Sequence, residues 1–138
     1  MFPWADENLL NYWQKPSSDA INLPHNADST RWIAKQFMGL ADGIKLIHEC
    51  KPEKSNRDFL APAEGDKIYG RHRDLKPENI LWFRNDDRGI LQIADFGLSE
   101  FHKGSSVQVP ASQVGGSRTY RAPEFDATRA VVAPSSDM

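Results

Sequence analysis

The chain has 138 residues, of which 39% are hydrophobic and 26% are charged. This composition allows a hydrophobic core and excludes a compositionally disordered chain, and the length fits one ordinary domain. The formal net charge of −2 gives no basic surplus for binding nucleic acid. Cys50 is the single cysteine, which excludes an internal disulfide and a cysteine-based metal site.

The chain shows no sequence signal for a membrane or for export. No apolar run approaches the roughly 20 residues that span a bilayer. The first residues, Met1 to Glu7, lack the positive start and the apolar core of a signal peptide. We therefore expect a soluble intracellular protein, cytoplasmic or nuclear, and the sequence carries no indication of its oligomeric state.

The first third of the chain predicts two helices. Residues Met1 to Ala5 are expected to be extended, and a short helix is expected over Glu7 to Gln14, ended by Pro16. A loop composition follows as far as Asp28. The second and stronger helix is expected from about Thr30 to Cys50, with Asp28, Ser29 or Thr30 as its cap. Its apolar residues recur at gaps of four and three and so share one face, namely Ile33, Phe37, Leu40, Ile44 and Ile47.

Two glycines interrupt this helix. Gly39 and Gly43 each weaken an isolated helix by about 1 kcal/mol relative to alanine, and they indicate places where a neighbouring backbone could pack closely. The helix must therefore be stabilised by packing against other parts of the protein. In this chain, however, we expect its apolar face to be exposed.

The later part of the chain predicts short strands. A polar insertion is expected over about residues 51–66, followed by strands at Lys67–Arg71, Ile80–Phe83 and Ile90–Ala94. The turn composition of Asn85 to Gly89 predicts that the last two strands form a β-hairpin. The stretch from Ser99 to Ser117 has little periodicity and is expected to be a mobile segment. No internal repeat is present.

Three motifs follow one another in the second half. Residues 72–79 read His-Arg-Asp-Leu-Lys-Pro-Glu-Asn, residues 95–97 read Asp-Phe-Gly, and residues 122–124 read Ala-Pro-Glu. In this order they are signature blocks of protein kinases. The chain therefore resembles the eukaryotic protein kinase family, and its motifs are similar to those of the serine/threonine branch.

Phosphoryl transfer requires positioning and charge compensation, and the motif residues can supply both. Asp74 can accept the proton of an attacking hydroxyl, and Lys76 can offset charge on the transferring phosphate. Asn79 and Asp95 offer hard oxygen ligands to Mg²⁺. The predicted hairpin returns the chain, so both metal ligands can lie at its open ends, and Gly97 would give the following turn its freedom.

Each of these residues also has a simpler interpretation. Loop aspartates and lysines are usually solvated, Arg73 would be a surface charge, and Leu81 would be core; only the joint pattern favours a site. The four histidines lack the spacing of a metal site. The four tryptophans favour packing over a nucleic-acid stacking platform.

The resemblance implies further roles. Asp74 matches the catalytic base and Lys76 the phosphate-contacting lysine, while Asn79 and Asp95 match the metal-binding pair, so ATP and Mg²⁺ are the implied cofactors. His72 and Phe96 match positions of an internal spine, and Arg73 matches an arginine that pairs with a phosphorylated activation segment. Leu81 matches the floor under adenine. Residues 1–6 are similar to the hinge, whose backbone near Pro3 and Ala5 would meet the adenine edge.

The resemblance also implies an architecture. It is α+β, an incomplete kinase-like large (C-terminal) lobe that is mainly helical with short β-hairpins at the active site. The helix over residues 30–50 would be its central helix, and residues 95–124 its activation segment. Ser117 matches a position that contacts the catalytic aspartate and lysine, which favours protein serine or threonine as substrate. Ser105, Ser106 and Ser112 are hypothetical phosphorylation sites, or ordinary exposed serines.

The pattern departs from the family in three respects. No Gly-x-Gly-x-x-Gly-x-Val loop or Val-Ala-Ile-Lys lysine precedes the catalytic loop, few residues follow Glu124, and the connection before Tyr69 is long. We therefore expect a fragment of a serine/threonine kinase domain that transfers the ATP γ-phosphate in its full-length form, with doubtful activity of this chain alone. The alternative is an inactive kinase-like fragment or pseudokinase that acts as a binding module.

Overall fold

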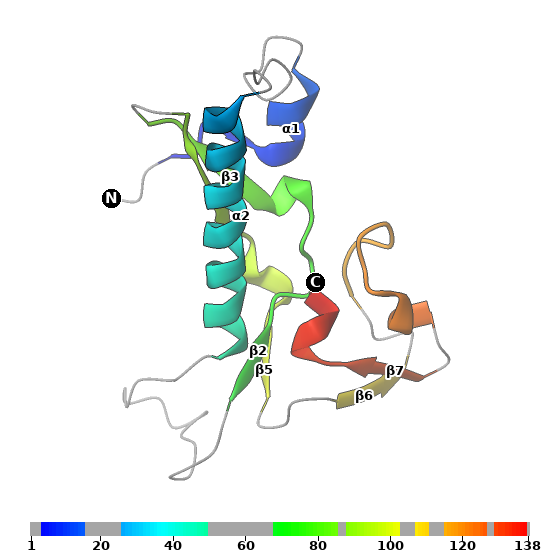
Figure 1. The fold of residues 1–138 in the computed structure, drawn as a ribbon. Coiled ribbons are helices and arrows are strands. Elements are labelled where there is room, and N and C mark those ends of the chain that lie inside the picture. Colours follow the sequence, from blue (N-terminus) through cyan, green and yellow to red (C-terminus); the bar gives the residue numbers. More distant parts are fainter. Residues whose placement is uncertain are drawn as a thin grey trace. The chain divides into compact units, whose positions relative to one another are not determined.

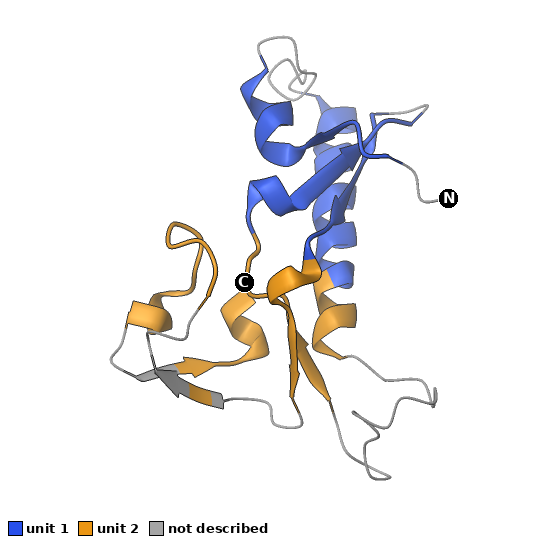
Figure 2. Ribbon diagram, turned by 180° about the vertical axis from the view of Figure 1, so that it is seen from behind, with its two compact units in different colours: residues 1–43, 76–95 blue, residues 44–75, 96–138 orange. Residues whose placement is uncertain are grey.

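The computed structural model describes residues 4–15, 26–49, 68–85, 88–102, 107–110, 115–126 and 129–137. The chain divides into two compact units, which Figure 2 colours separately. Unit 1 contains residues 1–43 and 76–95, and unit 2 contains residues 44–75 and 96–138. The fold mixes helices and sheets (Figure 1). It agrees with the α+β prediction at that level, whereas the large-lobe assignment and the mainly helical character are not confirmed.

Unit 1 is built on a three-stranded antiparallel sheet. Strands β1 (Glu7–Asn8), β3 (Ile80–Phe83) and β4 (Ile90–Ile93) lie in the order β1-β3-β4. The β3–β4 pairing confirms the predicted hairpin. Its turn requires a glycine, because Gly89 has a φ of +89° and a side chain there would collide with the Trp82 indole.

Helix α1 (Leu9–Gln14) follows β1 directly. It starts two residues later than predicted because Asn8 is its N-cap: the Asn8 side chain accepts a hydrogen bond of 2.8 Å from the Asn11 amide. The helix ends as predicted, since Lys15 has the extended backbone that a residue before proline prefers.

Helix α2 (Ala27–His48) confirms the long predicted helix, but the predicted caps are wrong. Asn26 is the capping residue, and its side-chain oxygen accepts a hydrogen bond of 2.9 Å from the Ser29 amide. The residues expected to cap the helix, Asp28, Ser29 and Thr30, lie inside its first turn. Asn26 is as good a cap as serine or aspartate, and the helix simply begins one position after it.

The side of α2 that packs in unit 1 differs from the predicted apolar face. Trp32 is buried and its Nε1 donates to the Gly89 carbonyl at 3.1 Å, while the Gln36 side chain accepts from the Leu91 amide at 2.9 Å. On the predicted apolar face, Ile33 and Phe37 are 39% and 69% exposed, as expected, whereas the other three residues of that face are half-buried, namely Leu40, Ile44 and Ile47.

The two glycines of α2 have different surroundings. A methyl group at Gly43 would meet the end of the Ile93 side chain at 3.4 Å, so the neighbour there is a side chain and not the backbone that was expected. A methyl group at Gly39 would meet nothing within 4 Å, so the expectation of close packing is wrong there.

The core of unit 1 is aromatic. It is formed by Leu9, Tyr12, Trp32 and Trp82, with the Tyr12 and Trp82 rings stacked at 4.9 Å. Burying side chains of this size stabilises a fold by about 1.5–3 kcal/mol each. Packing is therefore confirmed for Trp32 and Trp82, whereas Trp4 and Trp13 are exposed.

Unit 2 contains two antiparallel strand pairs. Strand β2 (Tyr69–Arg71) pairs with β5 (Glu100–His102), and β6 (Val107–Pro110) pairs with β7 (Arg129–Val132). Figure 1 shows β2 and β5 side by side. A small core of Ala122, Phe125 and Val132 lies in this unit. Strands β5 and β6 fall within the stretch from Ser99 to Ser117, where no regular structure was predicted. Its polar composition hid the strands, because long-range pairing rather than local propensity forms them.

Some predictions fall outside the described residues. They concern residues 1–3 of the expected hinge, the loop over residues 16–25, Cys50, the insertion at residues 51–66, and the candidate phosphorylation sites Ser105, Ser106 and Ser112. Where the structure does describe the chain, it contains no helix that has both the length and the apolar character needed to cross a membrane.

Candidate catalytic site

Asp74 is buried in unit 2 and is held by the backbone of a distant segment. Its Oδ1 accepts a hydrogen bond of 3.0 Å from the Ser117 amide, so the predicted contact of Ser117 with Asp74 is made through the main chain. Gly116, with a φ of +91°, allows this approach, because a side chain at Gly116 would strike the Arg73 carbonyl oxygen. The contact fixes one carboxylate oxygen of the predicted base.

His72 is fully buried beside the second motif. Its ring centroid lies 5.2 Å from that of Phe96, with a tilt of 59° between the ring planes. The two residues that the resemblance assigned to an internal spine are therefore neighbours within unit 2. Phe96 remains 53% exposed, so the pair is not a closed core.

Arg73, immediately before Asp74, has a φ of +71°. A left-handed backbone is costly for a non-glycine residue, by on the order of 1–3 kcal/mol, and it persists only where the surroundings enforce it. Two carboxylates provide that enforcement. Asp137 accepts from the Arg73 amide at 2.8 Å, and Glu100 forms an ion pair with the Arg73 guanidinium.

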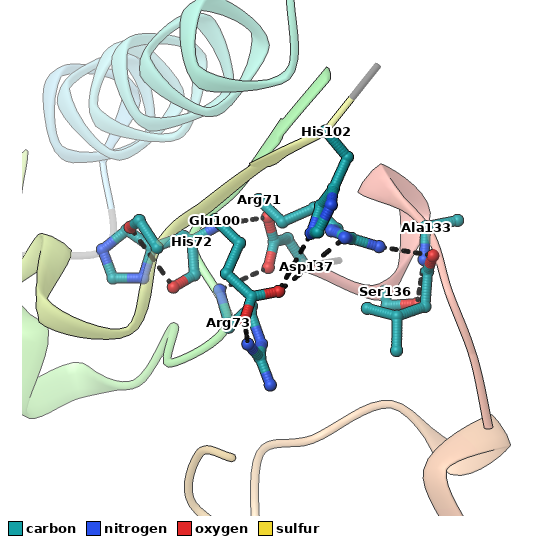
Figure 3. A network of polar contacts seen from close by, with 10 residues as sticks. Arg71, His72, Arg73, Glu100, His102, Ala133, Ser136 and Asp137 are labelled. Carbon is teal, nitrogen blue, oxygen red and sulfur yellow. Dashed lines mark hydrogen bonds and ion pairs between the residues drawn. The ribbon is translucent and has the colours of Figure 1, made fainter. Parts of the chain in front are cut away.

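Asp137 is a site residue that the sequence interpretation missed. Its carboxylate, 3% exposed, also accepts from the His72 amide at 2.7 Å (Figure 3). The same carboxylate lies 3.0 Å from His48 Nε2. Charge-assisted hydrogen bonds to two successive amides are among the strong ones in proteins. Asp137 therefore anchors the two residues that precede the predicted base. The sequence carried no signal for it beyond a single acidic residue near the chain end.

Glu100 is the second residue that was missed. It lies in β5 opposite Arg71 of β2, 3.1 Å from His102 Nε2 and 3.8 Å from an Arg71 guanidinium nitrogen. Desolvation, the largest influence, raises the pKa of Glu100, but the hydrogen bond from His102 and the charges of Arg73, His102 and Arg71 together outweigh it. The net result is a pKa below the ordinary glutamate value. Burial lowers the pKa of Arg71, and Glu100 opposes that shift.

The two predicted metal ligands, Asn79 and Asp95, lie in unit 1 at the open end of the predicted hairpin. The Ala94 amide donates to the Asn79 carbonyl at 2.9 Å, which fixes the chain immediately before Asp95 against Asn79. The hairpin therefore joins the two predicted ligands as expected. Asn79 is buried, whereas Asp95 is exposed.

The conformational freedom predicted for Gly97 is instead required at Asp95. Asp95 has a φ of +61°, while Gly97 lies in an ordinary 3₁₀ turn (Phe96–Leu98) without a positive φ. Aspartate is one of the few non-glycine residues that tolerates this region. A strained residue at a predicted metal ligand is typical of a functional site.

The residues proposed to meet the nucleotide share unit 1. Leu81 is half-buried in β3, opposite Asn8 and Gln92. Ala5 is half-buried next to Asp6, whose amide donates to the Trp82 carbonyl at 3.1 Å. Lys76 has an extended backbone and its carbonyl accepts from the Asn79 amide at 2.9 Å, which starts the 3₁₀ turn Pro77–Asn79.

An open cleft in unit 2 reaches Asp74. It is lined by Arg73, Asp74, Leu75, Ser117, Tyr120, Arg121, Phe125, Ser136 and Asp137. Glu124, in the third motif, accepts a hydrogen bond of 2.7 Å from the Ser136 hydroxyl, which lowers the pKa of its carboxyl. The cleft is thus formed by the catalytic loop, the segment from Ser117 to Phe125 and the chain end around Ser136.

The comparisons with known proteins identify the family. The protein kinase domain model matches residues 67–138, which is more than half of the chain. The chain belongs to the protein kinase family, and it carries part of a protein kinase domain.

The similar proteins are serine/threonine kinases. The chain is 50% identical over 55 residues to the serine/threonine-protein kinase DCLK3 of Mus musculus, covering 39% of this chain and 6% of that protein. It is 29% identical over 132 residues to a G-type lectin S-receptor-like serine/threonine-protein kinase of Arabidopsis thaliana, and the match covers 92% of this chain and 14% of that protein. It is 47% identical over 53 residues to the calcium/calmodulin-dependent protein kinase type I of Schizosaccharomyces pombe, and the match covers 38% of this chain and 16% of that protein. The chain thus spans a small part of the length of each relative.

The chemistry of the donor set fits a nucleotide-bound Mg²⁺. Asp95 is an exposed residue with a carboxylate, and Asn79, whose backbone carbonyl accepts from the Ala94 amide, has a side-chain amide oxygen. Mg²⁺ is usually bound by one or two protein oxygens together with phosphate oxygens and water, rather than by a full protein cage. Two hard donors at the mouth of a hairpin are sufficient for such a site.

Proposed function

We propose that this chain is the catalytic-loop region of a protein serine/threonine kinase that transfers the γ-phosphate of ATP to a protein hydroxyl. The observation that carries the proposal is the position of Asp74, which is buried, bonded to the Ser117 amide and open to the cleft of unit 2. An intracellular setting, cytoplasmic or nuclear, is part of the proposal, because ATP is the phosphate donor.

Each residue has a defined role in the proposal. Asp74 accepts the proton of the substrate hydroxyl, and the hydrogen bond from the Ser117 amide fixes the position of one oxygen of its carboxylate. Lys76 places a positive charge beside the transferring phosphate. Asn79 and Asp95 hold Mg²⁺, which would neutralise charge on the phosphate oxygens. Leu81 forms the floor under adenine, and the backbone near Ala5 meets the adenine edge.

The choice of serine or threonine as substrate rests on Ser117 and Lys76. Both match positions of the serine/threonine branch, and two of the relatives named above are serine/threonine-protein kinases by name.

Nucleotide binding by this chain tests the metal-binding half of the proposal. Titration with Mg²⁺ and a non-hydrolysable ATP analogue, followed by calorimetry, should give binding that Asp95→Asn weakens about tenfold or more, because the carboxylate is a direct ligand. Asp28→Asn is the matched control, since Asp28 is an exposed aspartate of the same unit. Equal affinity of Asp95→Asn and wild-type chain would contradict the assignment of Asp95.

Phosphoryl transfer by the full-length protein tests the catalytic half. Asp74→Asn should lower kcat for a serine peptide by about 10²–10⁴-fold, the usual contribution of a general base, with little change in nucleotide affinity. Nucleotide binding with no transfer by the wild-type protein would instead favour the non-catalytic binding module.

A further inference from the structure

Glu100 lies at the centre of a cationic cluster beside the predicted base. One carboxylate oxygen pairs with the Arg73 guanidinium, and the other lies 3.1 Å from His102 and 3.8 Å from Arg71 (Figure 3). All of these residues belong to unit 2, as does Asp74. The cluster is therefore a local feature of the loop that carries the base.

The strand pairing of β2 and β5 creates this arrangement. Arg71 is directly opposite Glu100 in the antiparallel register, and Tyr69 is opposite His102. Directly opposed residues of an antiparallel pair project on the same face, and so do residues two apart on one strand. Glu100 is thus placed between Arg71 and His102 by the backbone.

The arginines of this cluster are stabilised by a nearby negative charge, and Glu100 provides one. The side chains of Arg71 and Arg73 are only 3% and 14% exposed, whereas that of Glu100 is 43% exposed. Arg71 also donates to the Val132 carbonyl, and its buried Nε has no hydrogen-bond partner among the described residues. Buried cations left without a nearby anion are strongly unfavourable.

We propose that Glu100 is a positioning residue that holds Arg73, and through it Asp74, by occupying the anion site that a phosphate group would otherwise fill. Carboxylate and phosphate are both bound by arginine with charge-assisted hydrogen bonds. Kinase activation loops are commonly ordered by new pairs between arginine and a phosphorylated residue. In this chain the arginine already has a carboxylate partner, so the loop that carries Asp74 is ordered without phosphorylation.

This inference rests on the proposed function only in naming Asp74 as the base. Its test uses no nucleotide and no phosphoryl transfer, so failure of the proposed function would leave its outcome unchanged. The Ser117 amide is the probe, because it donates to the Asp74 carboxylate and its exchange with solvent reports the position of that group. The Phe125 amide, bonded to the Ala122 carbonyl in the same unit, reports general loosening.

Hydrogen exchange of the 138-residue chain should separate the two effects. Glu100→Gln should speed exchange of the Ser117 and Arg73 amides by about tenfold, the scale of a partly buried ion pair, and leave the Phe125 amide nearly unchanged. The matched control is Glu49→Gln, because Glu49 is an exposed glutamate of the same unit. Equal exchange in the Glu100→Gln and wild-type chains would overturn the proposal.

Inorganic phosphate provides a second measurement. Added to Glu100→Gln, it should restore much of the protection at Ser117, because the vacated arginine pair can bind it, and it should leave the wild-type chain unaffected. A phosphate effect of the same size in both chains would count against an occupied anion site.

Glu100→Asp is the control variant that separates loss of the charge from a general folding defect. This variant keeps the negative charge and should retain most of the protection that Glu100→Gln loses. Identical behaviour of the Asp and Gln variants, whether folded or not, would show that the charge at this position does not hold Arg73.

Discussion

Replacing Asp137 by asparagine should release the backbone that precedes the predicted base. The carboxylate accepts from the His72 amide at 2.7 Å and from the Arg73 amide at 2.8 Å, in a position that is 3% exposed. Asparagine is nearly the same size, so the change removes charge and one acceptor without creating a cavity. Its one carbonyl oxygen can serve one amide, while its NH₂ group faces the other.

The magnitude follows from these contacts. A buried donor left unsatisfied costs about 1–3 kcal/mol, and loss of charge assistance at the remaining hydrogen bond costs about 1 kcal/mol more. Asp137→Asn should therefore destabilise the loop around His72 and Arg73 by about 2–4 kcal/mol. Since 1.4 kcal/mol corresponds to a factor of ten, exchange of the two amides should rise by roughly 30- to 700-fold.

Amide hydrogen exchange is the suitable assay, because a chain of two compact units need not unfold in one two-state step. Asp126→Asn is the control: Asp126 is an aspartate of the same unit that pairs with Arg121 at 2.6 Å but is 74% exposed. Its removal should cost no more than about 1 kcal/mol. An effect of Asp137→Asn below about 0.5 kcal/mol, or one equal to that of Asp126→Asn, would refute this account of the loop.

Three further predictions concern two glycines and the pH dependence of stability. Gly116→Ala should lower thermal stability by more than about 1 kcal/mol and expose the Ser117 amide, because Gly116 has a φ of +91° and a methyl group would strike the Arg73 carbonyl. Gly39→Ala, where the methyl group meets nothing, should stabilise the chain by about 1 kcal/mol, and a lower melting temperature would argue against the described helix. The pKa of Glu100 is lower in the folded chain than the ordinary glutamate value, so its stabilising contribution should be fully present above the ordinary value and disappear as the pH falls through the folded one. Denaturation curves of the wild-type and Glu100→Gln chains should therefore converge in acid, and a constant difference between them would contradict the ion-pair network.

Local patterns in the sequence were sufficient for the elements that depend on neighbours along the chain. The hairpin was predicted from the strand-favouring residues Ile80–Phe83 and the turn composition of Asn85 to Gly89. Strand propensity and turn formation depend on only a few neighbouring residues, so the sequence alone reveals them. The 3.6-residue period predicted α2 for the same reason. The motif blocks identified the protein kinase family, since their residue types and spacing are specific without any structure.

Tertiary structure alone decided how the loop before Asp74 is held. Asp137 is 65 residues from His72, and Glu100 meets Arg73 only because β5 pairs with β2 in one register. Such contacts have no periodic signature, since a hydrogen bond or ion pair between distant segments depends on how the chain returns. The sequence thus determined the family and the chemical groups of the candidate site. The fold determined the anchors of that site, Asp137 and Glu100, because only the paired strands and the returning chain end place a carboxylate beside those amides and arginines.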